Sequence, residues 1–303
     1  MLKPSITLFS VVCLSLLLMT ALTPTFSQAQ SAAPTFTTID IPGAMETDVN
    51  DLNTAGNVLV GYDCTNDLCD APHVGIAQAW AMINGTVKML KPPGSIQSRA
   101  YGVNDSNQVV GWYIDSSNVT HGFMFSKGKF TTIDPPGATL TNAWSINKAG
   151  VIVGAFTDSS GVFHGFIDNA GTFTTFNAPN GAILTEFTGI NNKNQMTGIY
   201  DDSAATEHGF TLVGKTFTDV TFPGVGVAVT ATDRLNDSGE IVGLWGTSNS
   251  GPFQGYSRKG TKYTTINFPA STETRCRGLN NAGEIVGRYT DTAGAIHGFT
   301  VVP

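Results

Sequence analysis

Residues 146–154 read INKAGVIVG, and residues 164–166 read HGF. The first stretch places Asn147 after an apolar residue and before a short turn, and an apolar strand ending in Gly154 follows the turn. Asparagine favours the start of a type I turn, and Gly150 suits the left-handed conformation that completes a three-residue hairpin. β-branched and aromatic residues on both sides of the turn predict antiparallel strands.

The same pattern occurs six times along the chain. The repeat asparagines follow one another at intervals of 51, 43, 44, 45 and 44 residues, and Gly or Asn stands three residues after each. A fixed period of this length is the signature of a repeat fold. The first interval is about seven residues longer than the others and contains Cys64 and Cys69. The repeat asparagines are Asn53, Asn104, Asn147, Asn191, Asn236 and Asn280.

Each repeat unit predicts four short strands, which in the third unit cover residues 142–146, 151–157, 163–167 and 172–176. Three tight turns and one longer connection containing proline are typical of a propeller blade. The last unit lacks its fourth strand, whereas residues 36–41 form a strand without a unit. We therefore expect a six-bladed β-propeller of four-stranded blades over residues 36–303, closed by the N-terminal strand, which completes the C-terminal blade. The alternative, an open solenoid, has no use for this displaced strand.

Composition and charge exclude several classes of protein. Only 13% of the residues are charged and 34 of 303 are glycine, which argues against a helical bundle and for turn-rich β structure. The net charge is −7 and no basic stripe is present, so neither nucleic acid nor an anionic membrane surface is expected as a partner. One all-β domain is compatible with this length.

Residues 1–29 have the features of a secretion signal. Lys3 gives a positive start, residues 6–22 form an uncharged apolar run, and small residues precede the expected cleavage after Ala29. We expect a signal peptide at 1–29, a linker at 30–35, and a protein that is secreted or held at the cell surface, in an extracellular or periplasmic location. A retained membrane anchor is the alternative. After cleavage no membrane contact is expected.

Three cysteines remain after cleavage. Cys64 and Cys69 are predicted to form a disulfide, as an oxidising compartment allows. A metal site there would need further ligands, and only His73 lies near in the sequence. We therefore predict no metal and no cofactor. Cys276 takes the place of small apolar residues in other units, which predicts a small buried side chain.

Histidine recurs once in each of four units, as the first residue of His-Gly-Phe, and an aspartate stands six residues before it. In the fifth unit Gln254 and Thr247 replace the two residues together. Because the aspartate and the histidine are replaced together, we predict that they form a structural pair rather than a catalytic one. In such a pair the Asp caps the hairpin turn or accepts a hydrogen bond from the imidazole ring. The pairs are Asp115 and His121, Asp158 and His164, Asp202 and His208, and Asp291 and His297.

Units of the form Ile-Asn-x-x-Gly-x-Ile-Val-Gly followed by His-Gly-Phe resemble the HAF-type extracellular repeat, named for a His-Ala-Phe tripeptide that has Gly in the middle here. The resemblance covers nearly the whole chain after residue 35. It implies a secreted bacterial protein with a repeat β architecture, and it brings no activity and no catalytic residues. The first and fifth units depart from it, with Gln78-Ala79-Trp80 and Gln254-Gly255-Tyr256.

In a closed propeller the ligand site usually lies where loops and innermost strands meet at the channel. Polar and aromatic residues that differ between units at these positions are therefore the candidates. Aromatic faces, arginines and carboxylates suit the recognition of sugars or carboxylates, and they equally suit a solvated channel. The predicted ligand-binding residues are Asp48, Arg99, Tyr101, Trp144, Glu186, Asp233, Arg275 and Arg277, within a wider polar set that adds Asn50, Asp51, Asn142 and Arg234.

The sequence favours a secreted, monomeric, non-catalytic propeller that binds an extracellular ligand, either a glycan or a protein, at the channel mouth. No Gly-x-Ser-x-Gly motif, phosphate loop or dinucleotide fingerprint is present, which argues against several enzyme classes. Two alternatives remain open: a propeller hydrolase or lyase that acts on sugars or lactones, and a cell-surface scaffold for protein interactions.

Overall fold

The computed structural model describes residues 33–69, 75–179 and 181–302. From Pro34 onward the chain forms one compact unit. The predictions for the signal peptide and its cleavage, and the residue His73, lie outside the described residues. No helix in the described part of the chain is long and apolar enough to span a membrane.

The described residues form twenty-four β-strands. They are β1 (Thr35–Ile39), β2 (Glu46–Leu52), β3 (Val58–Cys64), β4 (Ala77–Ile83), β5 (Thr86–Leu90), β6 (Ser95–Val103), β7 (Val109–Asp115), β8 (Thr120–Ser126), β9 (Lys129–Ile133), β10 (Leu140–Ile146), β11 (Ile152–Thr157), β12 (Phe163–Asn169), β13 (Thr172–Phe176), β14 (Leu184–Ile190), β15 (Met196–Asp201), β16 (Glu207–Val213), β17 (Thr216–Val220), β18 (Val229–Leu235), β19 (Ile241–Gly246), β20 (Gln254–Lys259), β21 (Lys262–Ile266), β22 (Glu273–Leu279), β23 (Ile285–Thr290) and β24 (Ile296–Val302). The prediction of an all-β repeat fold is confirmed.

Consecutive strands pair antiparallel in meanders of four. The meanders are β2–β5, β6–β9, β10–β13, β14–β17 and β18–β21. Strands β22–β24 pair in the same way, and β1 adds to β24 from Thr35 opposite Val302 to Ile39 opposite Gly298. Single parallel bridges, such as Phe163 to Leu184, join some neighbours, so that the hydrogen-bonded strands count as four sheets.

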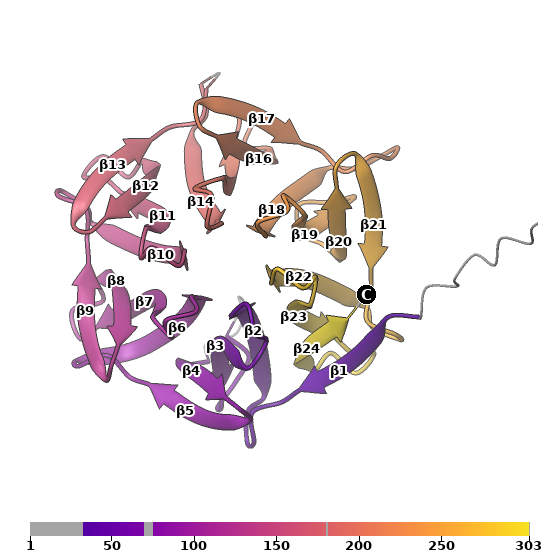
Figure 1. The fold of residues 1–303 in the computed structure, drawn as a ribbon, viewed down its shortest axis with the longest axis horizontal. Coiled ribbons are helices and arrows are strands. Elements are labelled where there is room, and N and C mark those ends of the chain that lie inside the picture. Colours follow the sequence, from indigo (N-terminus) through magenta and orange to yellow (C-terminus); the bar gives the residue numbers. More distant parts are fainter. Residues whose placement is uncertain (1–32, 70–74, 180, 303) are drawn as a thin grey trace, which may run out of the picture. The chain divides into compact units, whose positions relative to one another are not determined.

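The meanders stand around a central axis, with their first strands innermost (Figure 1). Between neighbouring meanders lies a core built on the last residue of each His-Gly-Phe tripeptide and its equivalents, which have no exposed surface. These residues are Trp80, Phe123, Phe166, Phe210, Tyr256 and Phe299. The repeated motif therefore places one large aromatic side chain in each interface, which explains why the pattern recurs at this spacing.

The local predictions agree closely with the structure. The four strands expected in the third unit correspond to β10–β13, with no boundary displaced by more than two residues. The turn residue Gly150 has a φ of 86°, as a left-handed turn position requires. The Asn147 Oδ1 atom accepts hydrogen bonds from the backbone N–H groups of Ala149 and Val151, each at 3.0 Å.

The repeat asparagines also link consecutive units, which the sequence did not predict. The Asn104 Nδ2 atom donates to the backbone carbonyl of Asn147 at 2.9 Å, and Asn147 donates in turn to Asn191 at 3.3 Å. Asn191 and Asn236 continue the series, donating to the carbonyls of Asn236 and Asn280. One residue type therefore shapes the hairpins and, at four of them, also forms a hydrogen bond to the next unit.

The Asp and His residues that change together lie next to each other. His164 Nε2 is 3.2 Å from Asp158, and His208 Nε2 is 3.1 Å from Asp202. Asp158 also accepts hydrogen bonds from the backbone N–H groups of Ser160 and Val162, and its pKa is lowered, first by the bond from Val162 and then by the one from His164. Nδ1 of His164 lies 2.6 Å from Asn177, just beyond β13. The histidine thus ties the turn to the outermost strand, which is a structural task.

The remaining two pairs are looser. His121 and His297 lie 3.6 Å from Asp115 and Asp291, while their Nδ1 atoms approach Asp134 and Asp40. In the fifth unit Asn267 donates to Gln254 at 3.2 Å and replaces the histidine contact. Cys276 is fully buried, as predicted, and burial raises the pKa of its thiol.

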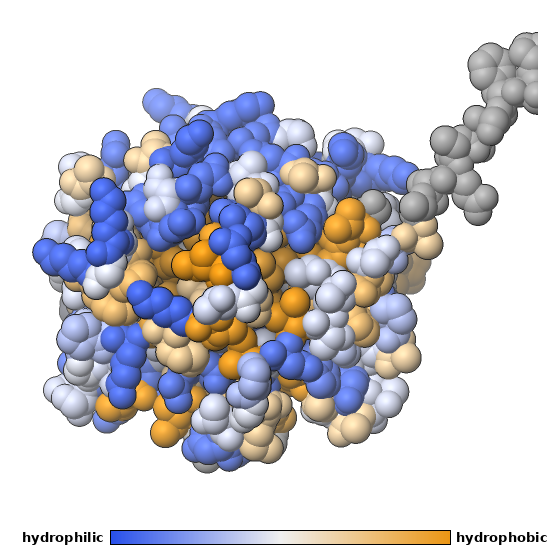
Figure 2. Space-filling view, turned by 60° about the horizontal axis from the view of Figure 1, so that its bottom comes forward, coloured by the Kyte–Doolittle hydropathy of each residue, from blue (hydrophilic) through white to orange (hydrophobic). Residues whose placement is uncertain are grey.

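Apolar side chains also reach the outer surface. Figure 2 shows them gathered in a band across the middle of the visible side, with hydrophilic residues above and below. The exposed residues Ile76, Met89 and Ile96 line a groove of about 250 Å³ beside β4–β6. This groove shares no lining residue with the channel cavity described next.

Candidate functional site

Every innermost strand contains a β-bulge at the same place. The residue that the ladder skips stands three positions before the repeat asparagine. A bulge leaves its extra residue unpaired and redirects the side chain. The bulge residues are Asn50, Tyr101, Trp144, Thr188, Asp233 and Arg277, and all of them line one cavity.

A glycine faces each bulge from the second strand of the unit. A Cβ atom on Gly154 would lie well under 3.0 Å from the backbone carbonyl oxygen of Asn142, and equivalent collisions occur in every other unit. Side chains therefore cannot be accommodated where the strands close around the bulge. The last glycine of the repeat motif therefore makes room for the bulge, and the bulge directs one side chain into the channel. The six glycines are Gly61, Gly111, Gly154, Gly198, Gly243 and Gly287.

The cavity has a volume of about 370 Å³, within the range of small-molecule sites. Its lining includes Ala205 and Asn249, which are exposed residues in hairpin turns and so place its mouth at that face. Glu186 and Arg275 add to the bulge residues from two positions earlier on their strands. The lining also includes Asp201 and Glu207 from the β15–β16 hairpin, and Phe253 before β20.

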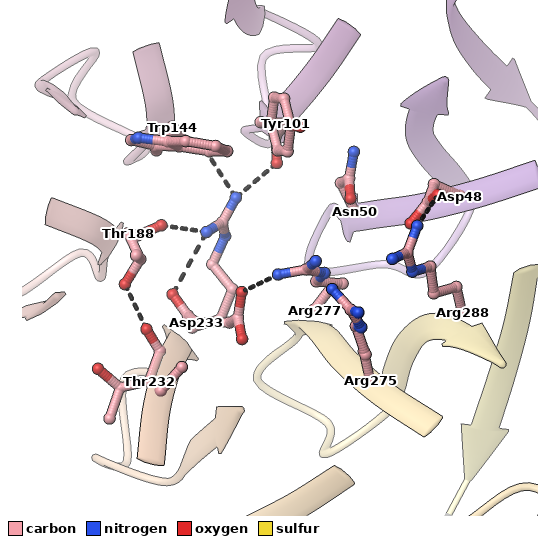
Figure 3. Close-up of polar contacts among 12 residues, drawn as sticks. Asp48, Asn50, Tyr101, Trp144, Thr188, Thr232, Asp233, Arg275, Arg277 and Arg288 are labelled. Carbon is pink, nitrogen blue, oxygen red and sulfur yellow. Dashed lines mark hydrogen bonds and ion pairs between the residues drawn. The ribbon is translucent and has the colours of Figure 1, made fainter. Parts of the chain in front are cut away.

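Arg234 forms the floor of this cavity. Its Nη2 atom donates to the carbonyl oxygens of Tyr101 and Trp144 at 2.5 and 2.7 Å, and Nη1 donates to those of Thr188 and Asp233. In Figure 3 dashed lines mark these contacts at the labelled residues Tyr101, Trp144, Thr188 and Asp233. Arg234 also lines the small hollow on the opposite face of the ring of strands. One buried guanidinium therefore fills the channel and holds the backbone of four bulge residues.

The two arginines on β22 are held in place by carboxylates. Arg277 Nη1 lies 3.0 Å from Asp233 Oδ1 (Figure 3), and Arg275 Nε lies 2.6 Å from Glu273 Oε1. The Arg275 guanidinium also stacks 4.8 Å from the centre of the Phe253 ring. Fixed guanidinium groups present their remaining N–H donors in a defined direction, as bidentate recognition requires.

Aromatic and acidic groups form the rest of the wall. Tyr101 and Trp144 meet edge to face, with ring centres 4.2 Å apart. Burial, together with Glu207 and Asp201, raises the pKa of Glu186 to about 7, although the Trp144 indole opposes the rise. Burial, together with Asp201 and Asp233, likewise raises the pKa of Glu207 to about 7, against the effect of Arg277 and Arg275. The cavity thus brings carboxyl and guanidinium groups together in one lining.

Most of the predicted ligand-binding residues meet in this cavity. Tyr101, Trp144, Glu186, Asp233, Arg275 and Arg277 line it, whereas Asp48 and Arg99 do not. Asp48 is 1% exposed and forms an ion pair with Arg288 at 3.1 Å. Binding by the six lining residues remains a prediction, but the structure brings them to one place.

Arg99 is covered by the insertion of the first unit. Its Nη2 atom donates to the carbonyl of Cys69 at 3.2 Å, and its guanidinium stacks over Tyr62 and Trp112 at 4.2 and 5.2 Å. Cys64 and Cys69 form the predicted disulfide, with Cα atoms 5.9 Å apart. The disulfide segment therefore occupies the contact that Arg99 was predicted to offer to a ligand.

One group of potential metal ligands occurs among the described residues: Glu46, Cys64 and Cys69, with ligand atoms within 4.8 Å of one another. The disulfide joins both sulfurs and leaves no thiolate. Glu46 accepts a hydrogen bond from the Cys69 N–H at 2.7 Å and pairs with Arg288 at 3.2 Å. Burial, with Asp48 next, raises the pKa of Glu46 to about 7. Glu46, Cys64 and Cys69 therefore already have partners within the protein, and we interpret them as a structural cluster rather than a metal site.

Sequence comparison missed several lining residues. Thr188 is uncharged and therefore did not stand out, although its position three residues before Asn191 marks it as a bulge residue. Asp201 and Glu207 lie on a hairpin rather than on an innermost strand. Their signal is a difference between units, because Ile114, Thr157 and Thr290 replace Asp201 elsewhere, and Thr120, Phe163 and Ile296 replace Glu207.

The acidic wall should make stability depend on pH. A carboxyl with a pKa of about 7 when folded and 4.5 when unfolded stabilises the fold most below pH 4.5, and this contribution is lost as the pH rises through 7. Glutamine cannot ionise, so Glu186→Gln or Glu207→Gln should add about 2 kcal/mol at pH 8, allowing for solvent screening, and little at pH 4. Thermal denaturation should show a rise of roughly 4–8 °C at pH 8. An equal rise at both pH values would contradict this account.

No protein-family model matches the chain, and no curated protein matches it in sequence. Solved structures do match. The chain is similar to AofleA from Arthrobotrys oligospora, with 8% identity, a TM-score of 0.55, and coverage of 89% of this chain and 86% of that one. It is similar to Aleuria aurantia lectin in complex with alpha-methyl-L-fucoside, with 10% identity, a TM-score of 0.51, and coverage of 88% and 96%.

A third similar structure is the β-propeller domain of the Trilobed protease from Pyrococcus furiosus, with 9% identity, a TM-score of 0.51, and coverage of 85% of this chain and 94% of that one. At these identities the similarity shows the fold alone. The fold is therefore propeller-like, in agreement with the prediction from the repeat.

Proposed function

We propose that this chain is a secreted, closed six-bladed β-propeller of the HAF-repeat type, and that it binds a saccharide in the channel cavity. Closure is supported by the pairing of β1 with β24, since it supplies the outermost strand that the last unit lacks. It is further supported by the parallel bridge between Glu46 of β2 and Ile296 of β24, which joins the first unit to the last. Such pairing also removes two exposed sheet edges.

The observation that carries the saccharide proposal is the composition of the cavity wall. Tyr101 and Trp144 offer apolar faces against which a sugar ring stacks, while Arg275 and Arg277 offer paired N–H donors. Glu186 and Glu207 add hydrogen-bond acceptors for hydroxyl groups. The similar structure of Aleuria aurantia lectin in complex with a fucoside supports the proposal, because that protein has a similar fold and binds a sugar derivative.

The geometry also reduces the cost of binding. Asp233 and Glu273 already hold the two arginines, so little side-chain freedom is lost when a ligand arrives. The backbone beneath the cavity is fixed by Arg234. A ligand would therefore meet a wall whose donors are oriented before it binds, which favours specificity for the spacing of its hydroxyl groups.

Titration calorimetry against a panel of neutral and charged oligosaccharides tests the proposal. Trp144→Ala should weaken binding at least tenfold because it removes the stacking face, and Arg277→Ala should do the same because it removes two donors. Arg258→Ala is the control, since Arg258 stacks on Tyr263 outside the cavity and should leave affinity unchanged. Wild-type affinity in both cavity variants would reject this site.

A second candidate is a hydrolase or lyase at the same cavity, and the two carboxyl groups with a pKa of about 7 favour it. Shortened oligosaccharides or opened lactones after incubation, detected by mass spectrometry with and without EDTA, would assign catalysis. Binding without any product supports the binding role. If no saccharide binds, the protein-interaction scaffold becomes the better hypothesis.

A further inference from the structure

The lining of the cavity contains more carboxyl groups than guanidinium groups. Its carboxylates are Glu186, Asp201, Glu207 and Asp233, and its guanidinium groups are Arg234, Arg275 and Arg277. The positive charges are largely used within the protein. Arg277 pairs with Asp233, Arg275 pairs with Glu273, and Arg234 lies 3.7 Å from the buried Asp51. The acidic wall therefore lacks a protein partner of its own.

The acidic residues of the cavity have few partners within the protein. Within the described residues Asp201 and Glu207 make no side-chain hydrogen bond and no ion pair, and Glu186 has only the Trp144 indole beside it. Asp233 is only 8% exposed, yet its Oδ2 atom has no hydrogen-bond partner there while Oδ1 is bound to Arg277. Buried carboxylate oxygens are almost always paired, so Asp233 Oδ2 points to a donor that arrives with the ligand.

The spacing of the acids indicates what kind of donor this is. Within the described residues no three of these acids bring carboxylate oxygens within 4.8 Å of one another. An ammonium group needs its acceptors at a similar spacing, so it bonds directly to one or two of these carboxylates while the others attract it through space. The aromatic pair of Tyr101 and Trp144 lines the same cavity as these acids.

We propose that the ligand is a saccharide with a free, protonated amino group, whose ammonium lies among the carboxylates of Glu186, Asp201, Glu207 and Asp233 while the ring stacks on the aromatic pair. This inference rests on the proposed saccharide binding and deepens it. Hydroxyl or carboxylate groups on the other side of the sugar then face Arg275 and Arg277. The ligand class is amino sugars rather than neutral or N-acetylated ones.

Binding of an ammonium group requires ionised carboxylates, so affinity should increase from pH 6 to pH 7. The groups that face Glu186 are Glu207, Asp201 and the Trp144 indole. Those that face Glu207 are Asp201, Asp233, Arg277 and Arg275, and Asp201 itself faces Asp202 and His208. Carboxylates predominate around both glutamates, and binding should therefore release protons to the buffer.

The test compares a glucosamine tetramer with its fully N-acetylated counterpart by titration calorimetry at pH 7. The free amine should bind at least tenfold more tightly, and Glu186→Gln or Glu207→Gln should reduce the ratio to about twofold. Glu240→Gln, outside the channel cavity, is the matched control and should keep the full ratio. Because the cavity variants should not lower the melting temperature, loss of the preference cannot be attributed to unfolding.

The remaining outcomes separate the two proposals. Equal affinity, or tighter binding of the acetylated tetramer, would overturn the amino-sugar inference and leave saccharide binding intact. Binding of neither tetramer, together with no binding of neutral sugars, would overturn both. If spermidine binds as tightly as the amino sugar and competes with it, charge alone is recognised, and the saccharide proposal fails.

Discussion

Replacing Arg234 by methionine should lower the free energy of unfolding by about 3–5 kcal/mol, the cost of leaving a buried charge and its partners unpaired. The substitution removes donors from the carbonyls of Tyr101, Trp144 and Thr188. It also leaves Asp51, 6% exposed, without its cation. Since a domain is stable by about 5–15 kcal/mol in total, the loss should be plain in urea unfolding at pH 7.

Two further variants make this result specific. Arg258→Met removes a partly buried guanidinium from the outer face and should change stability by no more than about 0.5 kcal/mol. Combining Asp51→Ala with Arg234→Met removes both charges and should recover part of the loss, because an unpaired carboxylate no longer remains. Native-like stability of the single Arg234 variant would show that the channel does not depend on this residue.

Gly154→Ala should destabilise the protein by at least about 3 kcal/mol, at the upper end of what overpacking costs. The new methyl group would collide with the Asn142 carbonyl oxygen and with the Phe166 ring. The first obstacle is backbone, which cannot move without breaking the pairing of β10 with β11, and the second is a fully buried core residue. Urea unfolding and near-ultraviolet circular dichroism should both report the loss.

Gly224→Ala is the matched control for this substitution. Gly224 lies in the connection before β18 with an ordinary backbone conformation, and the nearest atom to an added Cβ is the Val227 methyl group at 3.4 Å. Alanine should therefore be tolerated there, and stability should change by less than about 1 kcal/mol. If Gly154→Ala were equally harmless, the conclusion that the strands at the bulge are too close for a side chain would be wrong.

The repeat made the strands predictable because turn residues have few interchangeable substitutes. Asn147 and Gly150 specify one hairpin type, and six copies reinforce one another, so the elements could be located without an alignment. The pairing of β1 with β24 was equally accessible, because the last unit ends before its fourth strand and residues 36–41 supply one. Bulges were not predictable, since alternation alone does not show which residue a ladder skips.

The candidate site was predictable only where it follows the repeat. Tyr101 and Trp144 differ from their equivalents in size and chemistry, which drew attention to the right strand positions. In the sequence Arg99 differs from its equivalents in the same way. Whether it can contact a ligand depends on the segment at Cys69, which accepts its hydrogen bond, and such a tertiary contact between different units cannot be predicted from the repeat. Glu207 depends on the way a hairpin leans over the channel, which no periodic pattern records.

At the bulges, the backbone contacts that hold the fold are separate from the side chains that line the channel. Arg234 donates hydrogen bonds to the main-chain carbonyls of four bulge residues, and the strand pairing skips the bulge residues. Neither of these two features involves the side chains of the bulge residues. Asn50 and Thr188 do use their side chains in the frame, since they donate hydrogen bonds to the carbonyls of Ala100 and Thr232. The other four positions can be changed while these contacts are kept. A combinatorial library at Tyr101, Trp144, Asp233 and Arg277 would vary the recognition chemistry on a constant frame, which makes this chain a starting material for engineered receptors.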